Sequence, residues 1–224
     1  WPGRRTPPPR RGPARAAECL CSATARLLVK GADERVALGA RSSRARQSRV
    51  AEVYRCFIAV PLPPAFREAV AGLQRQVRDA CDTVMGRADM LRWVRPDDMH
   101  MTVRFLGDTP TRKMAPLGDL LEQSAARARC VDLSATGVDA FPSAARPRVL
   151  LLRMSDPTDV LSSLAKEIER GVRRLGFTRE ERPFTPHVTL ARARRDSRLP
   201  SLEGIVSGQE VGRASCRERV LYTV

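Results

Sequence analysis

Only two histidines occur in the chain, and each stands two residues before a threonine. The first triplet, HMT, covers residues 100–102 and the second, HVT, covers residues 187–189. A histidine changes charge near neutral pH, which makes it the usual proton donor or acceptor in catalysis. Two imidazoles could serve as acid and base, while two hydroxyls hold the non-bridging oxygens of a phosphate. This set of side chains predicts metal-free cleavage of a phosphate ester.

Apolar, β-prone residues surround both triplets, which lie in MHMTVRFLG at 99–107 and PHVTLAR at 186–192. In a strand, residues i and i+2 point to the same face. The imidazole and the hydroxyl of each triplet should therefore lie side by side. Two such strands meeting at a cleft would place all four groups around one small volume.

The elements around the triplets repeat in two halves. The first half predicts a strand from 53, a helix over 64–85, a short strand over 91–94, a strand over 99–106 and a helix over 111–129. The second half predicts strands over 131–141 and 148–154, a helix that ends at 175 and a strand over 184–192. We therefore expect a duplicated, bilobal α+β fold, with two small antiparallel sheets facing a central cleft and helices outside.

Most of the net positive charge lies in the first 50 residues. They hold 12 arginines and lysines against 3 acidic residues, in a chain with a net charge of +15. Their Pro-, Arg- and Ser-rich composition predicts that 1–52 is a disordered or non-native basic tail, with at most a short helix over 19–29. An alternative is a basic arm that contacts RNA phosphates. The charge of the whole chain is thus weak evidence about the ligand of the folded part.

Other function classes find little support. No stretch approaches the roughly 18 to 20 apolar residues of a membrane helix, and the start lacks the apolar core of a signal peptide. A cytoplasmic location is the expectation. The six cysteines show no zinc-ligand spacing, so we expect free thiols, no metal site and no cofactor.

Three segments resemble a known family: FIAVPLP at 57–63, RWVRPDDMHMTVRFLG at 92–107 and FTPHVTLARA at 184–193. They are similar to the 2H phosphoesterases, and within these to the RNA 2′,3′-cyclic phosphodiesterases, long called 2′-5′ RNA ligases. The resemblance runs from about residue 54 to about residue 211. It implies a phosphoesterase domain over 53–212, with lobes at about 53–130 and 131–212 that could exchange strands. Residues 213–224 form an atypical C-terminal tail that does not align.

The resemblance also implies an activity and a role for each site residue. The activity is metal-independent hydrolysis of a terminal RNA 2′,3′-cyclic phosphate to a 2′-phosphate by a monomer, with 2′-5′ ligation as the reverse reaction. His100 matches the proton donor and His187 the proton acceptor. Thr102 and Thr189 match the phosphate-binding hydroxyls, and Arg192 an arginine that faces the cleft. A regular strand would turn this arginine away from His187, so a bulge or a strand end after residue 190 is needed.

Some alternatives stay open. Phe105 holds the place after His100 that Arg192 holds after His187, and it is either a base-stacking surface or, as we expect, a core residue. The chain could be a catalytically inactive module that binds RNA ends. It could also act on small cyclic nucleotides or on 2′-5′ linked oligonucleotides. Neither triplet alone shows which imidazole carries the proton.

Overall fold

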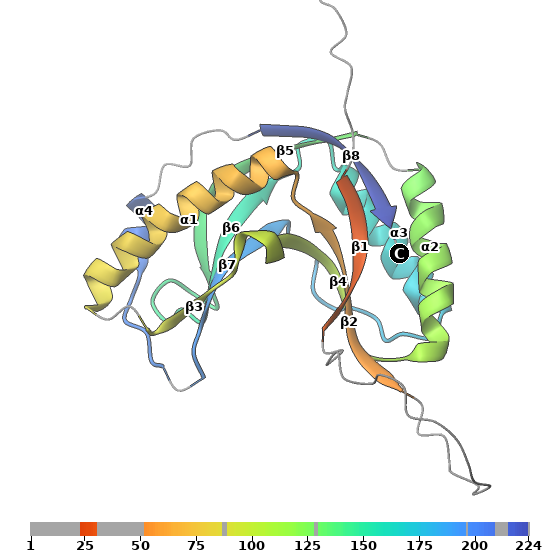
Figure 1. Ribbon diagram of the computed structural model, residues 1–224, viewed down its shortest axis with the longest axis horizontal. Coiled ribbons are helices and arrows are strands. Elements are labelled where there is room, and N and C mark those ends of the chain that lie inside the picture. The colour runs from red at the N-terminus through yellow and green to blue at the C-terminus, as the bar shows by residue number, and fades with distance from the viewer. Residues whose placement is uncertain are drawn as a thin grey trace, which may run out of the picture.

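Helices and strands alternate along the chain in an α+β fold, as predicted (Figure 1). The computed structural model describes residues 23–30, 52–86, 89–127, 130–195, 197–208 and 215–223. The strands are β1 Ala23–Lys30, β2 Val53–Pro61, β3 Leu91–Trp93, β4 His100–Pro110, β5 Cys130–Phe141, β6 Val149–Ser155, β7 His187–Ala193 and β8 Ser215–Thr223. The helices are α1 Pro64–Met85, α2 Met114–Arg127, α3 Val160–Arg174 and α4 Glu203–Gly208, with short 3-10 turns at Pro96–Asp98 and Thr111–Lys113.

Strands β2 to β7 form one antiparallel sheet. β2 pairs with β4, β4 with β7, β7 with both β3 and β6, and β6 with β5. The prediction of two separate sheets is wrong, because β4 and β7 pair where Met101 lies opposite Val188. That pairing joins the two halves, each of which contributes one histidine triplet. Figure 1 shows the strands as an arch, with α1 along one side and α2 and α3 along the other.

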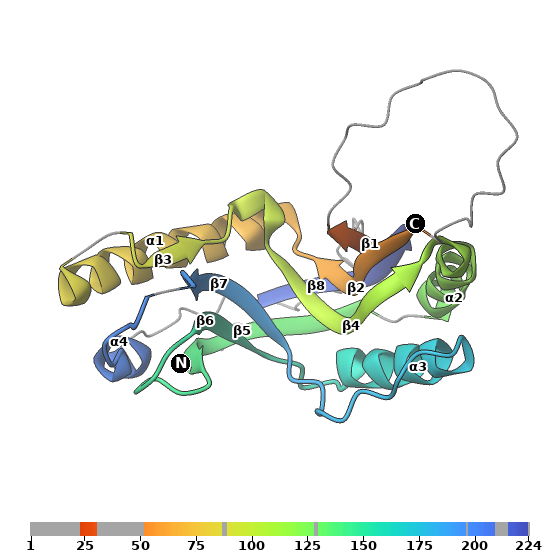
Figure 2. The ribbon, with the colours of Figure 1, turned by 90° about the horizontal axis from the view of Figure 1, so that it is seen from below.

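The core lies between the sheet and its helices. Helix α1 begins and ends where the sequence predicted, and its buried residues recur every three or four positions, so that one face of the helix packs inward. Helix α3 also packs one face inward, with buried residues Leu161, Leu164, Ile168 and Val172. Each such side chain contributes about 1.5–3 kcal/mol on burial. Figure 2 shows α2 beside α3 at one end of the sheet and α1 with α4 at the other.

Two further strands extend the sheet. Residues 23–30 form β1, so the short helix predicted over 19–29 is wrong for this part. β1 pairs antiparallel with β2 and parallel with β8, which in turn pairs antiparallel with β5. The helix prediction was wrong because it used local propensity only. The segment forms a strand because the edge of β2 offers it backbone hydrogen-bonding groups.

Part of the organisation predicted from sequence is untested. Apart from β1 and Glu52, the predicted tail 1–52 lies outside the described residues, and the domain bounds stay a prediction. In the described part of the chain, no helix combines the length and the apolarity that a bilayer crossing needs. The cytoplasmic location and the monomeric state also stay predictions.

Candidate active site

The two histidine triplets lie side by side on one face of the sheet. Met101 of β4 and Val188 of β7 are directly opposite one another, and both are 0% exposed because they point into the core. Neighbouring residues of a strand point to the opposite face. The histidine and threonine side chains of both triplets therefore share that other face, where all four are half-buried. One pair of opposed residues thus brings together groups that are 87 positions apart in the sequence.

Both imidazoles are held in the same way. Nδ1 of His100 lies 2.6 Å from the carbonyl oxygen of Asp98, and Nδ1 of His187 lies 2.8 Å from that of Thr185. A carbonyl oxygen can only accept a hydrogen bond, so each Nδ1 donates its proton. Each Nε2 is then left to exchange protons with a ligand. The site therefore has two oriented imidazoles with the same reacting nitrogen.

A β-bulge in β7 turns Arg192 to the histidine face. Residues 189 and 191 of β7 lie opposite the consecutive residues 151 and 150 of β6, which leaves Leu190 as the extra residue. Leu190 and Ala191 are consequently both buried, and the exposed Arg192 follows. A bulge exchanges the two faces of a strand beyond it. Of the two alternatives predicted after residue 190, a bulge or a strand end, the structure has the bulge.

Strand β4 contains the same irregularity at the same distance from its histidine. Residues 102 and 104 lie opposite the consecutive residues 59 and 58 of β2, so Val103 is the extra residue. Phe105 is therefore 56% exposed, and the expectation of a core phenylalanine is wrong. Its ring centroid lies 6.0 Å from that of Phe57, which is itself 5.0 Å from the His100 ring. We call Phe57 and Phe105 the aromatic pair.

Burial and nearby charges set the protonation of His100. Burial lowers its pKa from the ordinary value of 6.5, while the hydrogen bond to the Asp98 carbonyl raises it. The cationic Arg192 lowers it further, and His187 acts in the same direction. These effects show that the second histidine and the arginine are within electrostatic reach of the first. The free site therefore favours a neutral imidazole at His100.

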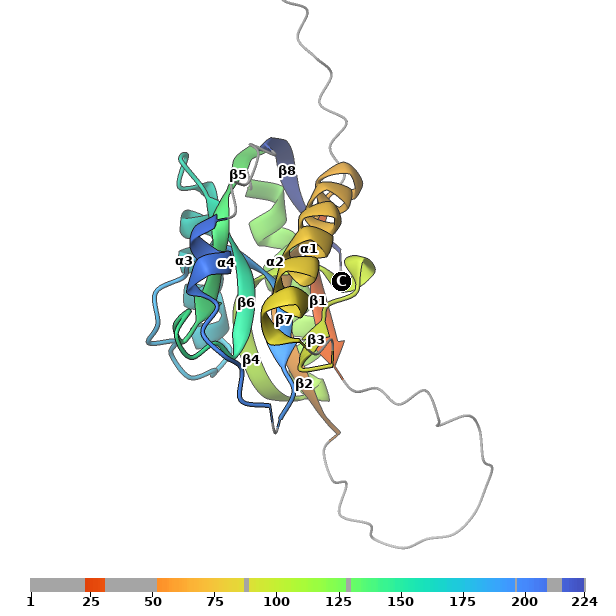
Figure 3. The same ribbon diagram turned by 90° about the vertical axis from the view of Figure 1, so that its left-hand side faces the viewer.

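Gln74 of α1 supports the bulge. This glutamine was not among the site residues predicted from the sequence. Its Nε2 donates hydrogen bonds to the carbonyl oxygens of Leu190, at 2.9 Å, and of Val94, at 2.8 Å. The glutamine is only 8% exposed. Figure 3 shows α1 running alongside β7; the amide connects β7 to Val94, the residue that follows β3. The signal was a polar residue inside the apolar stripe of the helix.

Arg104 is a second supporting residue that the sequence did not reveal. It is 9% exposed, and its Nε lies 2.6 Å from a carboxylate oxygen of Glu169 on α3. Its guanidinium also donates to the carbonyl oxygen of Thr178 and lies 3.4 Å from Glu180. These contacts fasten β4 to the segment that leads into β7. A buried arginine of this kind needs such partners, because an unpaired charge in the interior is costly.

Other groups of interest lie outside the site. Cys56 and Cys81 are free and buried, and burial raises the pKa of Cys81 to about 11, which makes it a poor nucleophile. In the described ranges, no group of three histidine, cysteine, aspartate or glutamate side chains could hold a metal ion. By their chemistry, the oriented imidazoles, the hydroxyls and the arginine of the site can move protons and bind an anion.

Known proteins share this sequence and fold. The chain matches the family described as LigT like Phosphoesterase at residues 60–151 and again at 152–217. A protein of Geobacillus stearothermophilus named RNA 2′,3′-cyclic phosphodiesterase is 34% identical over 61% of this chain and 41% of its own length. A protein of the same name from Methanothermobacter thermautotrophicus is 27% identical over 70% of this chain and 83% of its own. The chain thus spans less than half of the first relative and most of the second.

Two solved structures have a similar fold. The protein TT0787 of Thermus thermophilus superimposes with a TM-score of 0.53 and 28% identity, over 65% of this chain and 78% of its own. LigT of E. coli complexed with 3′-AMP superimposes with a TM-score of 0.51 and 28% identity, over 66% of this chain and 79% of its own.

Replacing Gln74 by leucine should lower stability, because the carbonyl oxygen of Val94 would lose its amide donor and the bulge one of its supports. We expect a loss of about 1–3 kcal/mol in the free energy of unfolding, the usual cost of a buried polar group left unpaired. Urea denaturation measures it. The matched control is Gln76→Leu on the exposed side of the same helix. Equal losses in the two variants would contradict the role assigned to Gln74.

Replacing Arg192 by glutamine should raise the pKa of His100, because a cation that disfavours the charged imidazole is removed. Proton NMR titration of the histidine rings measures this directly in a chain with two histidines. His100→Asn assigns the signal, and Arg75→Gln on the exposed side of α1 removes the same charge elsewhere. An unchanged His100 pKa in Arg192→Gln would show that the two side chains do not interact.

Proposed function

Since this chain belongs to the LigT-like phosphoesterase family, we propose that it hydrolyses a terminal 2′,3′-cyclic phosphate of RNA to a 2′-phosphate. In this proposal His100 is the proton donor and His187 the proton acceptor, while Thr102, Thr189 and Arg192 bind the phosphate. The observation that carries it is the shared face of the two triplets, with both Nε2 atoms left for proton transfer. The relatives named RNA 2′,3′-cyclic phosphodiesterase support the same substrate.

The proposed reaction is an in-line displacement at phosphorus. Nε2 of the neutral His187 accepts a proton from water, and the resulting hydroxide attacks the cyclic phosphate. The bond from phosphorus to the 3′ oxygen breaks, and the protonated His100 gives its Nε2 proton to that oxygen. The product has a 2′-phosphate and a 3′-hydroxyl. The hydroxyls and the Arg192 guanidinium stabilise negative charge on the non-bridging oxygens during attack. With an RNA 5′-hydroxyl in place of water as the attacking group, the same proton transfers would form a 2′-5′ linkage and release the 3′-hydroxyl.

Binding of the phosphate would prepare the donor. His100 has a lowered pKa in the free site, partly because Arg192 is a nearby cation. An anionic phosphate held against the arginine offsets that charge and favours a proton on the imidazole. The charged form of His100 is therefore promoted when the leaving oxygen is in place.

The aromatic pair gives the substrate a second surface. The Phe57 ring centroid lies 5.0 Å from that of His100, and the centroid of the exposed Phe105 ring lies 6.0 Å from that of Phe57. Bases stack on such rings with about 1–3 kcal/mol each, largely without regard to sequence. We therefore place the terminal nucleobase against the aromatic pair in the proposed complex.

The direct test is to incubate the full chain with an RNA oligonucleotide that ends in a 2′,3′-cyclic phosphate, in the presence of EDTA. We expect release of a 2′-phosphate end, because the proposed proton transfers use protein groups alone. His100→Ala and His187→Ala should each lower kcat by about 10²- to 10⁴-fold, the usual contribution of a positioned acid or base. Circular dichroism checks that both variants fold.

The outcome also separates the alternatives. Binding of the RNA end without turnover would indicate an inactive binding module. Faster turnover of a 2′-5′ linked oligonucleotide or of a small cyclic nucleotide would indicate a related activity on another leaving group. Loss of the reaction in EDTA would contradict metal-independent chemistry.

The pH dependence tests the two histidine roles. A donor must be protonated, so kcat/KM should fall as the pH rises through the lowered pKa of His100 in the free enzyme. In Arg192→Gln this alkaline limb should move to higher pH, even though weaker phosphate binding reduces the rate. If His100 were instead the base, the acidic limb would move. A rate that is flat from about pH 5 to about pH 9, with chemistry rate-limiting, would exclude the histidine pair.

A further inference from the structure

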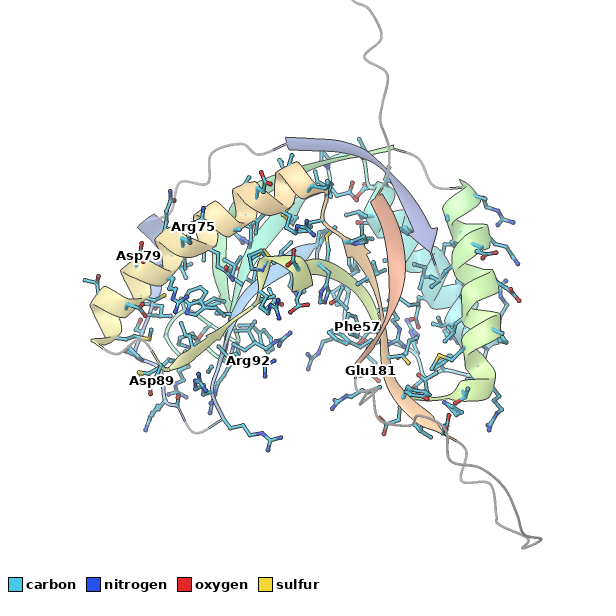
Figure 4. All side chains as sticks on the ribbon, viewed as in Figure 1. Phe57, Arg75, Asp79, Asp89, Arg92 and Glu181 are labelled. Carbon is cyan, nitrogen blue, oxygen red and sulfur yellow. The ribbon has the colours of Figure 1, made fainter. Side chains whose placement is uncertain are left out.

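Two exposed arginines face one another at the end of the site. Arg92 of β3 lies directly opposite Arg192 of β7 in the antiparallel pairing. Side chains that are directly opposite in such a pair lie on the same face of the sheet, about 4.5–5.5 Å apart at their Cβ atoms. Because the bulge at Leu190 turns Arg192 to the histidine face, Arg92 is on that face as well. Figure 4 labels Arg92 and Phe57 on the inner side of the arch.

Like charges directly opposite one another destabilise a sheet. Among the residues that the structure describes, neither arginine takes part in an ion pair with a carboxylate. On the other side of β7, the residue directly opposite Arg192 is the apolar Val149. The two guanidinium groups therefore form a cationic spot whose repulsion an anionic ligand would relieve.

The position of this spot relative to the histidines indicates which anion it suits. The bulge at Leu190 turns Arg192 to the face of His187 and Thr189, so the proposed function assigns it to the terminal phosphate. β4 and β3 pair with the same edge of β7, β4 at Val188 and β3 at Ala191–Ala193, so Arg92 lies further along that edge than the triplets do. A second phosphate of the same RNA strand would have to lie next to the first one. Guanidinium groups bind phosphate oxygens in a bidentate way, and such contacts position a nucleic acid without reading its sequence.

We propose that Arg92 binds the phosphodiester on the 5′ side of the terminal nucleotide, so that the preferred substrate is the end of an RNA chain rather than a mononucleotide. This inference rests on the proposed function, because it takes the terminal cyclic phosphate to lie between the two histidines. It names a recognition residue outside the histidine triplets and decides between two substrates that the sequence left open.

Three substrates test the proposal: adenosine 2′,3′-cyclic phosphate, the dinucleotide ApA with a 2′,3′-cyclic phosphate, and that dinucleotide with an uncharged methylphosphonate linkage. The wild-type chain should show the highest kcat/KM with the charged dinucleotide. Arg92→Gln should lower that value about tenfold or more, as expected for loss of one charge-assisted hydrogen bond. The other two substrates lack the charge that Arg92 would bind, so their kcat/KM should be unchanged.

Arg75→Gln is the matched control, because it removes the same charge from the exposed side of α1 (Figure 4). It should leave all three values unchanged at about 0.15 M salt, where charges more than about 8 Å apart are largely screened. An equal decrease with all three substrates in Arg92→Gln would overturn the inference, because it would show damage to the site rather than lost recognition. Equal use of charged and uncharged dinucleotides by the wild type would overturn it as well.

Failure of the proposed function gives a different result, in which no substrate is hydrolysed. A binding measurement would then test whether Arg92 recognises a second phosphate. Fluorescence anisotropy would compare labelled dinucleotides that end in a 2′-phosphate, with charged and with methylphosphonate linkages. A preference for the charged linkage in the wild type that disappears in Arg92→Gln would support the second phosphate site, and the absence of a preference would overturn it.

Discussion

The opposition of Met101 and Val188 is the constraint on which the site depends. Both side chains are 0% exposed, so the position of each is fixed by the core. The two triplets flank these anchors, and the alternation of a strand sends the imidazoles and hydroxyls to the other face. Proton transfer requires placement within hydrogen-bond reach of the substrate. Residues that pack into the interior are suited to provide it, because close-packed cores deform little.

The two halves are alike where they hold the histidines and different five residues later. Each imidazole bonds through Nδ1 to a carbonyl two residues before it, and each strand has a bulge three residues after it. Beyond the bulge, β4 presents Phe105 and β7 presents Arg192. An exposed aromatic ring and a cation thus occupy equivalent places on the two sides. The repeated backbone geometry orients the two imidazoles alike, while the difference between Phe105 and Arg192 makes the two sides of the site unequal.

The sequence predicted the local elements well because they depend on local patterns. The apolar stripe of residues 64–85 defined α1, and the β-prone flanks of both histidines defined β4 and β7. The need for a bulge or a strand end after residue 190 followed from strand alternation together with the resemblance, which implies that Arg192 faces the cleft. The joining of β4 to β7 did not, because periodicity carries no information about which strands pair. Phe105 was misjudged for a similar reason, since the bulge at Val103 appears only in the register with β2.

Charge shows most clearly why placement matters more than composition. The net charge of +15 suggests nucleic-acid binding, yet many of its arginines lie in the first 50 residues. The chemistry of the site depends instead on the burial and the neighbouring charges of individual side chains. Burial and Arg192 keep the His100 imidazole from holding its proton tightly, and Arg92 adds a second cation directly opposite the first. An anionic ligand would relieve the repulsion between the arginines and favour protonation of His100 at the same time. Substrate binding and preparation of the acid would then be one electrostatic event.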